Sequence, residues 1–254
     1  MSSTRRTPKL GQHLLTNPHV SAAVADAAGV HKGTVVLEIG PGKGALTKEL
    51  LKRGAHVVAV EKDPAMVAVL KDTCADEINT GQLMLLEEDV RTFFAHTLPT
   101  RMTHPYVVAA NIPYYITGEI LRELLTAPVQ PNTVALLVQK EVAERIARTK
   151  KESILSLSVK VYGTPKYVST VKRGNFAPPP KVDSAILAIT DISRAHFVGT
   201  SEARFFDIVK AGFGQKRKTL AGNLKRVFGD SLGVGDKVRA EDVPLADWLE
   251  LAKR

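Results

Sequence analysis

The chain has 254 residues, 44% of them hydrophobic, and a formal net charge of +9 from 35 basic and 26 acidic residues. No apolar run reaches membrane-spanning length and the start of the chain lacks a signal-peptide core, which predicts a cytoplasmic protein of one or two domains with no membrane partner. Cys74 is the only cysteine, which excludes an internal disulfide, and the basic excess suits a nucleic-acid partner.

The amino-terminal segment divides into a polar stretch and a helix. Residues 1–11 are polar and basic, and they predict a flexible arm that either stays disordered or closes over a ligand. Asn17 followed by Pro18 is the pattern of a helix N-cap and a first helical residue. We therefore expect a helix from residue 18 to about Gly29.

The stretch 35–63 predicts a strand, a glycine-rich turn, a helix and a second strand that ends in Glu61. The turn carries Gly40, Gly42 and Gly44, which let the backbone approach a ligand where a Cβ would clash. An acid about 20 residues beyond the turn can hold the two hydroxyls of a ribose. A glycine turn on its own also fits a tight structural turn, but the full pattern predicts a nucleoside-bearing cofactor.

The turn also indicates which cofactor to expect. Its spacing is GxGxG rather than GxGxxG, and it contains no GK[ST] phosphate loop. Glu38 precedes the glycines, where a carboxylate would repel the pyrophosphate of a dinucleotide and attract a cation. S-adenosylmethionine carries a sulfonium, an amino group and a ribose, and it fits this pattern of charge.

The next helix and strand place acidic residues at a third strand end. Pro64 begins a helix that is expected to reach residue 70, and residues 83–86 form an apolar run of strand length. Asp89 follows this strand, where its carboxylate can accept from the adenine amino group of the cofactor with Val90 against the ring. Glu87 fits a solvated acidic turn better.

A second motif, Asn111-Ile112-Pro113-Tyr114, ends the strand expected over residues 106–110. Open α/β sheets bind ligands at the carboxyl ends of their strands. The Asn111 side-chain oxygen and the carbonyl of Ile112 or Pro113 can each accept an N–H from an exocyclic amino group, which favours a pyramidal nitrogen with a free lone pair. Tyr114 can stack on the base. The alternative is a strand end capped by asparagine and stopped by proline.

The rest of the chain predicts further strands and a carboxyl-terminal set of helices. The expected elements are a helix capped by Thr117, a strand over 134–138, a charged helix over 141–151, a helix over 153–161, strands over 166–171 and 185–189, and helices beyond residue 191. The basic run 145–151 fits a solvated helix face better than an RNA-binding rim. Apolar residues at helical spacing interleave with lysines and arginines beyond 191, which predicts a helical domain with a basic surface.

Over nearly its whole length the chain resembles the ribosomal RNA adenine N6-dimethyltransferases. The motifs that carry this resemblance lie at residues 10–13, 36–44, 46–47, 60–63, 88–90, 111–116, 176–185 and 217–220. The Phe-Ala-Pro-Pro-Pro-Lys-Val-Asp-Ser-Ala loop and the Arg-Lys-Thr-Leu segment favour the branch that modifies small-subunit (16S) rRNA. Leu14 departs from the family pattern, which usually has phenylalanine there.

The resemblance implies a fold, an activity and a partner. The expected fold is α/β, with a doubly wound, Rossmann-like S-adenosylmethionine-dependent methyltransferase domain over 1–191 and a small all-helical, RNA-docking domain over 192–254. The expected reaction is N6,N6-dimethylation of 16S rRNA adenines during small-subunit maturation, by a monomer acting on rRNA or a subunit precursor. The alternatives are a large-subunit enzyme of the macrolide-resistance type, a DNA adenine methyltransferase, whose Asp-Pro-Pro-Tyr motif is absent, and a non-catalytic ribosome-assembly factor.

Matching positions also carry expected roles. The expected catalytic residues are Asn111, Pro113, Tyr114 and Phe176, the last facing the target base opposite Tyr114. The expected cofactor-binding residues are His13, Leu15, Gly40, Gly42, Glu61, Lys62, Asp89, Val90 and Asn111. The expected RNA contacts are Arg5, Arg6, Lys9, Lys216, Arg217 and Lys218. No metal is expected, because the sulfonium methyl group is already electrophilic.

Overall fold

The computed structural model describes residues 13–98, 102 and 105–254. The predicted basic arm over 1–11, with Arg5, Arg6 and Lys9, lies outside these residues. The described residues form two compact units, one containing residues up to Lys140 with Val168–Ala188 and the other containing Glu141–Tyr167 with Ile189–Arg254. The expected folding domains 1–191 and 192–254 stay a prediction.

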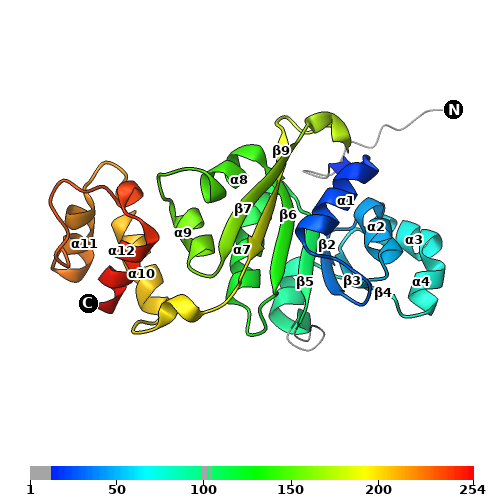
Figure 1. Cartoon of the computed structure of the whole chain (residues 1–254), viewed down its shortest axis with the longest axis horizontal. Helices are drawn as coiled ribbons and strands as arrows, with labels where there is room; N and C mark the ends of the chain where they lie inside the picture. Colours follow the sequence, from blue (N-terminus) through cyan, green and yellow to red (C-terminus); the bar gives the residue numbers. More distant parts are fainter. Residues whose placement is uncertain (1–12, 99–101, 103–104) are drawn as a thin grey trace. The chain divides into compact units, whose positions relative to one another are not determined.

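A seven-stranded sheet has the order β4-β3-β2-β5-β6-β9-β7 (Figure 1). Its strands are β2 (Val35–Ile39), β3 (His56–Glu61), β4 (Leu83–Glu87), β5 (Val107–Asn111), β6 (Thr133–Gln139), β7 (Thr164–Val171) and β9 (Ser184–Thr190). The pairs β2–β3, β3–β4, β2–β5 and β5–β6 are parallel. Strand order reverses between β2 and β5, and such a reversal opens a crevice at the carboxyl ends of the strands.

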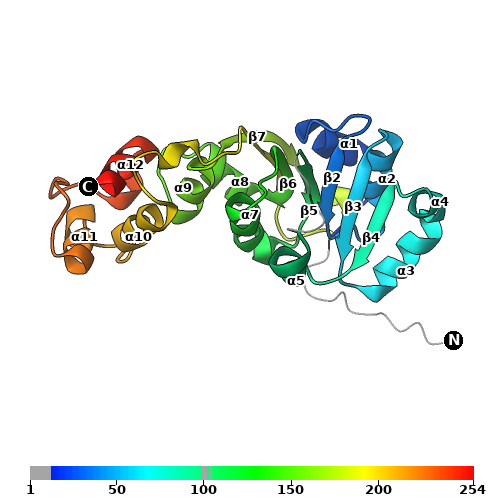
Figure 2. The ribbon, with the colours of Figure 1, turned by 90° about the horizontal axis from the view of Figure 1, so that it is seen from below.

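Helices cover both faces of these strands, as the doubly wound prediction requires (Figure 2). The helical segments of this unit are α1 (Pro18–Ala27), α2 (Ala45–Lys52), α3 (Pro64–Thr73), α4 (Ala75–Asn79), α5 (Val90–Thr92), the π-helical turn η1 (Phe93–Thr97), the 3-10 turn η2 (Tyr114–Ile116), α7 (Thr117–Thr126) and the 3-10 turn η3 (Arg173–Asn175). Helices α1 and α2 lie on one face, and α5 and α7 on the other. Alternate strand residues such as Val36, Val57 and Ala109 join the core under α1 and α2.

Helix starts follow the predicted capping chemistry, with one exception. Asn17 and Asp63 accept from the backbone N–H groups of His19 and Ala65, each at 3.0 Å, and a proline follows each cap. The prediction that Thr117 caps α7 is wrong. The turn η2 leads straight into the helix, so Thr117 is its first residue and its hydroxyl donates back to the Tyr114 carbonyl at 3.0 Å.

A short antiparallel pair lies beside the seven-stranded sheet. Strand β1 (Leu14–Leu15) pairs with β8 (Phe176–Ala177), with Leu14 opposite Ala177 and Leu15 opposite Phe176. The Thr16 N–H and hydroxyl both donate to the Asn175 carbonyl at 2.9 Å, which extends the pairing by one residue. Residues at the start of the described chain are thereby tied to the proline-rich loop.

The second unit is mainly helical. Its helical segments are α8 (Lys140–Ala147, whose first residue belongs to the first unit), α9 (Ile154–Lys160), η4 (Ala195–Phe197), α10 (Glu202–Gly212), α11 (Leu220–Phe228), η5 (Ala240–Asp242) and α12 (Leu245–Lys253). Helices α10, α11 and α12 bury Phe205, Leu224 and Trp248 between them. Val227, one of the apolar residues at helical spacing in this part of the sequence, is 53% exposed and does not join this core.

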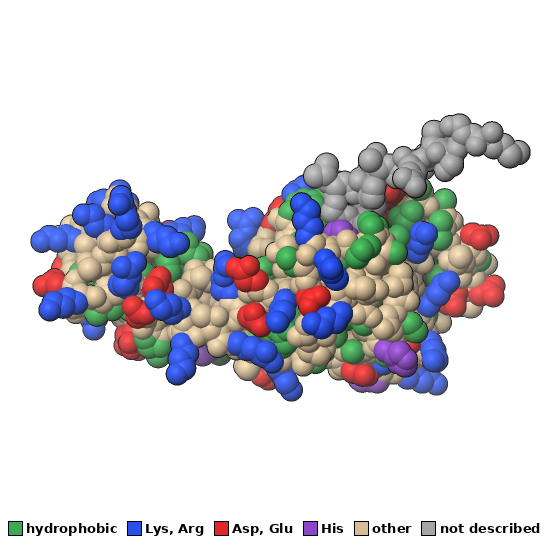
Figure 3. Space-filling model, turned by 90° about the horizontal axis from the view of Figure 1, so that it is seen from above, with side chains coloured by type: hydrophobic (Ala, Val, Ile, Leu, Met, Phe, Trp, Pro, Cys, Tyr) green, Lys and Arg blue, Asp and Glu red, His purple; other side chains and the backbone are tan. Residues whose placement is uncertain are grey.

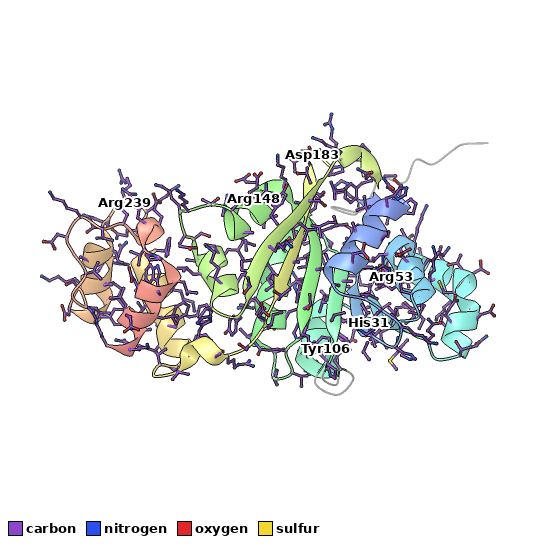
Figure 4. The ribbon with its side chains drawn as sticks, viewed as in Figure 1. His31, Arg53, Tyr106, Arg148, Asp183 and Arg239 are labelled. Atoms are coloured by element: carbon purple, nitrogen blue, oxygen red, sulfur yellow. The ribbon has the colours of Figure 1, made fainter. Side chains whose placement is uncertain are left out.

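The charged helix expected over 141–151 ends early, at Ala147. The N–H groups of Arg148 and Thr149 both bond the Glu144 carbonyl, which closes the last turn. The Arg148 guanidinium, labelled in Figure 4, stacks 3.6 Å from the centre of the Tyr167 ring. Lys151 pairs with Glu241 at 2.5 Å. Contacts within the protein therefore engage much of this basic run.

None of the helices in the described part of the chain combines the length and the hydrophobicity needed to cross a membrane. Within the same residues, no cluster of three or more His, Cys, Asp or Glu side chains is arranged to hold a metal ion.

Candidate functional site

A cavity opens at the carboxyl ends of β2, β3, β4 and β5 and has a volume of about 340 Å³, within the usual range for small-ligand pockets. Ten of the predicted site residues line it: His13, Gly40, Gly42, Glu61, Lys62, Asp89, Val90, Asn111, Pro113 and Tyr114. Leu15 and Phe176 do not line it. The sequence motifs therefore converge on one cavity, although they are far apart along the chain.

The glycine turn between β2 and α2 adopts a backbone that other residues rarely adopt. Gly40, Gly42 and Gly44 have φ angles of 66°, 58° and 82°. A Cβ on Gly42 would lie 2.7 Å from Leu14 Cδ2, so Leu14 packs where that Cβ would be. The turn brings the backbone of Gly40 and Gly42 to the cavity wall without side chains in the way, which fits a ligand of nucleoside size.

Glu61 is buried at the end of β3 and its carboxylate is held by two backbone donors. Its Oε2 accepts from the Gly42 N–H at 3.0 Å and its Oε1 from the Asp63 N–H at 2.9 Å. Each carboxylate oxygen can accept more than one hydrogen bond. The side chain is therefore oriented in advance and can still accept from the two hydroxyls of a ribose.

Glu38 is fully buried behind the glycine turn and does not line the cavity. Burial, with a smaller contribution from the negative charge of Glu61, raises the pKa of Glu38 to about 8. Thr47, which faces the Glu38 carboxyl, offsets part of this rise, and the Glu38 Oε2 atom makes no hydrogen bond within the described residues. Since a nearby cation lowers the pKa of a carboxyl group, a bound cationic ligand would favour the ionised form of Glu38.

Asp89 and Lys62 pair at the cavity wall, which the sequence alone did not predict. Asp89 accepts from the Arg91 N–H at 3.0 Å and from Lys62 Nζ at 3.1 Å. The Arg91 N–H bond, followed by the Lys62 contact, holds the pKa of Asp89 below its usual value. Asp89 is thus a fixed, ionised acceptor at the position predicted for the adenine end of the cofactor.

Asn111 ends β5 with its side chain anchored on the amino-terminal segment. Its Nδ2 donates to the His13 carbonyl at 2.9 Å. No hydrogen bond to the other amide atom, Oδ1, occurs within the described residues. Because the amide nitrogen is engaged, the oxygen is the end that can accept from a ligand in the cavity.

Tyr114 is also held from two sides. Its hydroxyl lies 2.5 Å from Ser184 Oγ, and its ring lies 5.9 Å from the His13 ring at a tilt of 32°. Burial raises the pKa of the Tyr114 hydroxyl. The His13 ring is itself fixed by the Pro178 carbonyl, 2.8 Å from Nδ1. The resemblance motif around Ser184 therefore supports the aromatic wall of the cavity.

The structure places Phe176 and Leu15 in the core, which the sequence motifs did not indicate. Phe176 is 3% exposed, pairs with Leu15 across β1 and β8, and belongs to the apolar cluster under α1. Successive strand residues point to opposite sides, so Leu14 lines the cavity while Leu15 packs inward. The predicted contact between Phe176 and a target base would need its side chain to leave this cluster, and it stays a prediction.

Further residues of the cavity wall escaped prediction. They include Phe94, Tyr115, and an ion pair in which Arg91 Nε and Nη2 contact the two Glu119 carboxylate oxygens at 2.6 and 3.0 Å. Arg91 and Glu119 are 28 residues apart, so no local pattern could have paired them. The only signal for these residues in the sequence was the second aromatic residue of the motif, Tyr115, which directly follows Tyr114.

The predicted RNA contacts in the second unit are exposed together. Lys216, Arg217 and Lys218 line a shallow hollow with Gln215, just before α11. The Lys216 carbonyl accepts from Arg239, also labelled in Figure 4, at 2.8 Å. Figure 3 shows lysine and arginine side chains over the surface of this unit. Such a surface suits a phosphate backbone.

Comparison with known proteins connects these features to one family. A family model described as "Ribosomal RNA adenine dimethylase" matches residues 3–254. The "Ribosomal RNA small subunit methyltransferase A" of Dehalococcoides mccartyi is 38% identical over 95% of this chain and 86% of its own, and that of Geobacillus thermodenitrificans is 34% identical over 96% and 88%.

Two solved structures are similar to nearly the whole chain. A dimethyladenosine transferase from Plasmodium falciparum superposes with a TM-score of 0.78 at 27% identity, covering 94% of this chain and 96% of its own. The 23S rRNA methyltransferase ErmE superposes with a TM-score of 0.72 at 26% identity, covering 94% and 98%. These likenesses confirm the predicted Rossmann-like methyltransferase fold.

Proposed function

Because the chain belongs to the ribosomal RNA adenine dimethylase family, we propose that it dimethylates the N6 of adenines in small-subunit (16S) ribosomal RNA with S-adenosylmethionine as methyl donor. The observation that carries this proposal is Asn111, whose amide nitrogen is engaged by His13 while its oxygen remains an acceptor at a nucleoside-sized cavity. The assignment to the small subunit is supported by the names of the relatives at 34–38% identity.

The cavity fits the proposed cofactor. S-adenosylmethionine would supply a methyl group already activated by the positive sulfonium. Glu61 would accept from the ribose hydroxyls, and Asp89, with Val90 beside it, would accept from the adenine amino group. The backbone of Gly40 and Gly42 would face the ligand, with His13 and Lys62 at the cavity wall. The buried Glu38 behind the turn adds a group that a cation would ionise.

Asn111 and the turn that follows it would present the adenine. Asn111 Oδ1 and a backbone carbonyl of Ile112 or Pro113 would accept the two N–H groups of N6, which favours the pyramidal nitrogen needed for attack. The Pro113 carbonyl already accepts from the Ile116 N–H at 3.2 Å, which fixes its direction. Tyr114 would stack on the base. The chain therefore contributes positioning and hydrogen-bond acceptance rather than a strong base.

Basic residues would supply the RNA-binding surface. Lys216, Arg217 and Lys218 would contact phosphates from the second unit, and Arg5, Arg6 and Lys9, which lie outside the described residues, would do so from the arm. The partner would be 16S rRNA within a small-subunit precursor, and the enzyme would act as a cytoplasmic monomer.

The proposal is tested by the destination of the methyl group. Methyl-labelled S-adenosylmethionine is incubated with undermethylated small subunits, large subunits or DNA, and the label is mapped by mass spectrometry and primer extension. We expect dimethyladenine in 16S rRNA alone. Label in 23S rRNA would assign the protein to the large-subunit branch, and an absence of label on all substrates would support a non-catalytic assembly factor.

A further inference from the structure

Tyr115 is an aromatic residue that has no role in the proposed reaction. Its side chain is 70% exposed, whereas every other Phe, Tyr and Trp side chain in the described residues is buried or half-buried. It lines the mouth of the same cavity as Asn111 and Tyr114. Single exposed apolar residues are common on protein surfaces, but this one lies at the edge of the candidate site on a fixed backbone.

The backbone that carries Tyr115 is fixed, whereas its ring stacks on no other aromatic side chain within the described residues. The Ile116 N–H bonds the Pro113 carbonyl at 3.2 Å, and the Thr117 hydroxyl bonds the Tyr114 carbonyl at 3.0 Å. Ile116 is buried, and the Tyr114 hydroxyl lies against Ser184. No hydrogen bond of the Tyr115 hydroxyl is made within the described residues. A fixed turn therefore presents an exposed ring, close to Arg91, at the cavity mouth.

The neighbouring charges favour contact with a base over contact with a phosphate. Arg91, on the same part of the rim, forms a two-point ion pair with Glu119. Its guanidinium is thus already neutralised by a carboxylate. The ring of Tyr115, rather than a free cation, is the group that this part of the rim offers to an approaching nucleic acid.

The exposure of the Tyr115 ring favours RNA over the cofactor as the partner that the ring contacts. A ligand inside a cavity of about 340 Å³ can cover only the part of the ring that forms the cavity wall. The larger, outward part faces solvent, where an RNA strand that enters the cavity with one base can contact it. An adenine that enters the cavity must leave its stack, so the base next to it loses a stacking partner.

We propose that Tyr115 is a stacking platform for the nucleotide next to the target adenine, and that it sets the enzyme's affinity for RNA and its preference at that flanking position. This inference rests on the proposed function. Tyr115 is a positioning residue, since it holds the RNA strand beside the site while Asn111 and Tyr114 contact the adenine. Base stacking on aromatic side chains tolerates any base, so the preference would be for stacking strength rather than for one hydrogen-bonding pattern.

The first test is kinetic, on undermethylated small subunits. Tyr115→Ala should raise KM by roughly tenfold or more, in line with loss of one stacked base, while kcat and the Kd for S-adenosylmethionine stay unchanged. Tyr115→Phe should behave like the wild type because it keeps the ring, and Tyr115→Leu should resemble the alanine variant. Val198→Ala removes apolar surface from a side chain that is 77% exposed in the second unit, and it should leave KM unchanged.

The second test does not depend on turnover. The protein is irradiated with ultraviolet light in complex with small subunits and S-adenosylhomocysteine, and cross-links are mapped by mass spectrometry and by stops in reverse transcription. We expect a cross-link from the peptide that contains Tyr115 to a nucleotide adjacent to the methylated adenine, and its loss in Tyr115→Leu.

Four results would overturn the inference. They are an unchanged KM in Tyr115→Ala, a leucine variant as active as the phenylalanine variant, a cross-link to a distant nucleotide, and a loss of cofactor affinity equal to the rise in KM, which would place the ring over the cofactor instead. Failure of the proposed function itself is recognised separately, because the wild-type protein would then methylate no small subunits.

Discussion

The carboxylate of Glu61 accepts a hydrogen bond of 3.0 Å from the backbone N–H of Gly42, 19 residues earlier in the chain. The contact joins the acid at the end of β3 to the glycine turn after β2. It depends on the left-handed backbone of Gly42, at φ 58°, which a residue with a Cβ adopts only with strain and a clash with Leu14. The acid and the turn therefore act as one preformed surface for a nucleoside.

Glu61→Ala should weaken the binding of S-adenosylmethionine at least tenfold, because charge-assisted hydrogen bonds are worth about 1.5–3 kcal/mol. The measurement is calorimetric titration of the free protein. Since Glu61 also accepts two backbone N–H groups, thermal unfolding must show that the variant is folded at the titration temperature. Glu87→Ala, at the exposed end of β4, is the matched control and should bind like the wild type. Unchanged affinity in folded Glu61→Ala would remove Glu61 from the site.

The pKa of Glu38, raised by burial to about 8 from an ordinary value of 4.5, predicts a pH-dependent stability. Between these values the folded protein keeps a proton that the unfolded chain has lost. The free energy of unfolding should therefore fall as pH rises through this window, by at most about 1.4 kcal/mol per pH unit from this group. Below this pH window Glu38 is protonated in both the folded and the unfolded protein, and above it Glu38 is ionised in both. Outside the window, Glu38 should therefore no longer change the free energy of unfolding as pH varies.

Glu38→Gln isolates this effect, because glutamine mimics the protonated acid. Urea unfolding at pH 5, 6.5 and 8 should show the wild type losing stability relative to the variant as pH rises. Glu87→Gln, which alters an exposed carboxylate, should leave the pH dependence as it is in the wild type. Parallel curves for Glu38→Gln and the wild type would show that Glu38 is not protonated in the folded protein near neutral pH.

Local sequence patterns predicted much of the fold but only part of the site. The cap at Asn17 and the turn after β2 depend on neighbouring residues, so the sequence alone was enough to recognise them. The other features of the site depend on tertiary packing, which local patterns do not predict. Tyr115 and the Arg91–Glu119 pair reach the cavity through long-range arrangement, and Phe176, expected at the site by resemblance, is held in the core by its pairing with Leu15. A motif match shows where a residue lies in the chain, not which way its side chain points.

Neutralising Lys216, Arg217 and Lys218 together should weaken RNA binding and make its salt dependence shallower. If each contacts one phosphate, the slope of log affinity against log salt should decrease by about 2 to 3, because each contact releases roughly one counterion. Affinity for S-adenosylmethionine should not change. A control that neutralises the exposed Lys32, Lys52 and Lys71 of the first unit removes the same charge. Equal slopes in the two triple variants would mean that the cluster before α11 is an ordinary solvated surface.

Asn111→Ala should affect methyl transfer far more than cofactor binding. The Asn111 oxygen is oriented by the bond from its amide nitrogen to the His13 carbonyl, and it accepts best from a nitrogen that has become pyramidal. Its contribution is therefore made chiefly in the transition state. The single-turnover rate should fall by a factor on the order of a hundred or more, as for the loss of one preorganised polar contact.

Both methyl additions should slow in Asn111→Ala, because monomethylated N6 still has one N–H to donate. The measurement is a rapid-quench time course on undermethylated small subunits, with mass spectrometry separating mono- from dimethyladenine, and calorimetry for the cofactor. Asn79→Ala, at the end of α4 and exposed, should keep wild-type rates. If Asn111→Ala also keeps them while the label still reaches adenine N6, the acceptor role proposed for Asn111 is wrong, and the reaction must depend on the orientation provided by Tyr114 and the backbone carbonyls alone.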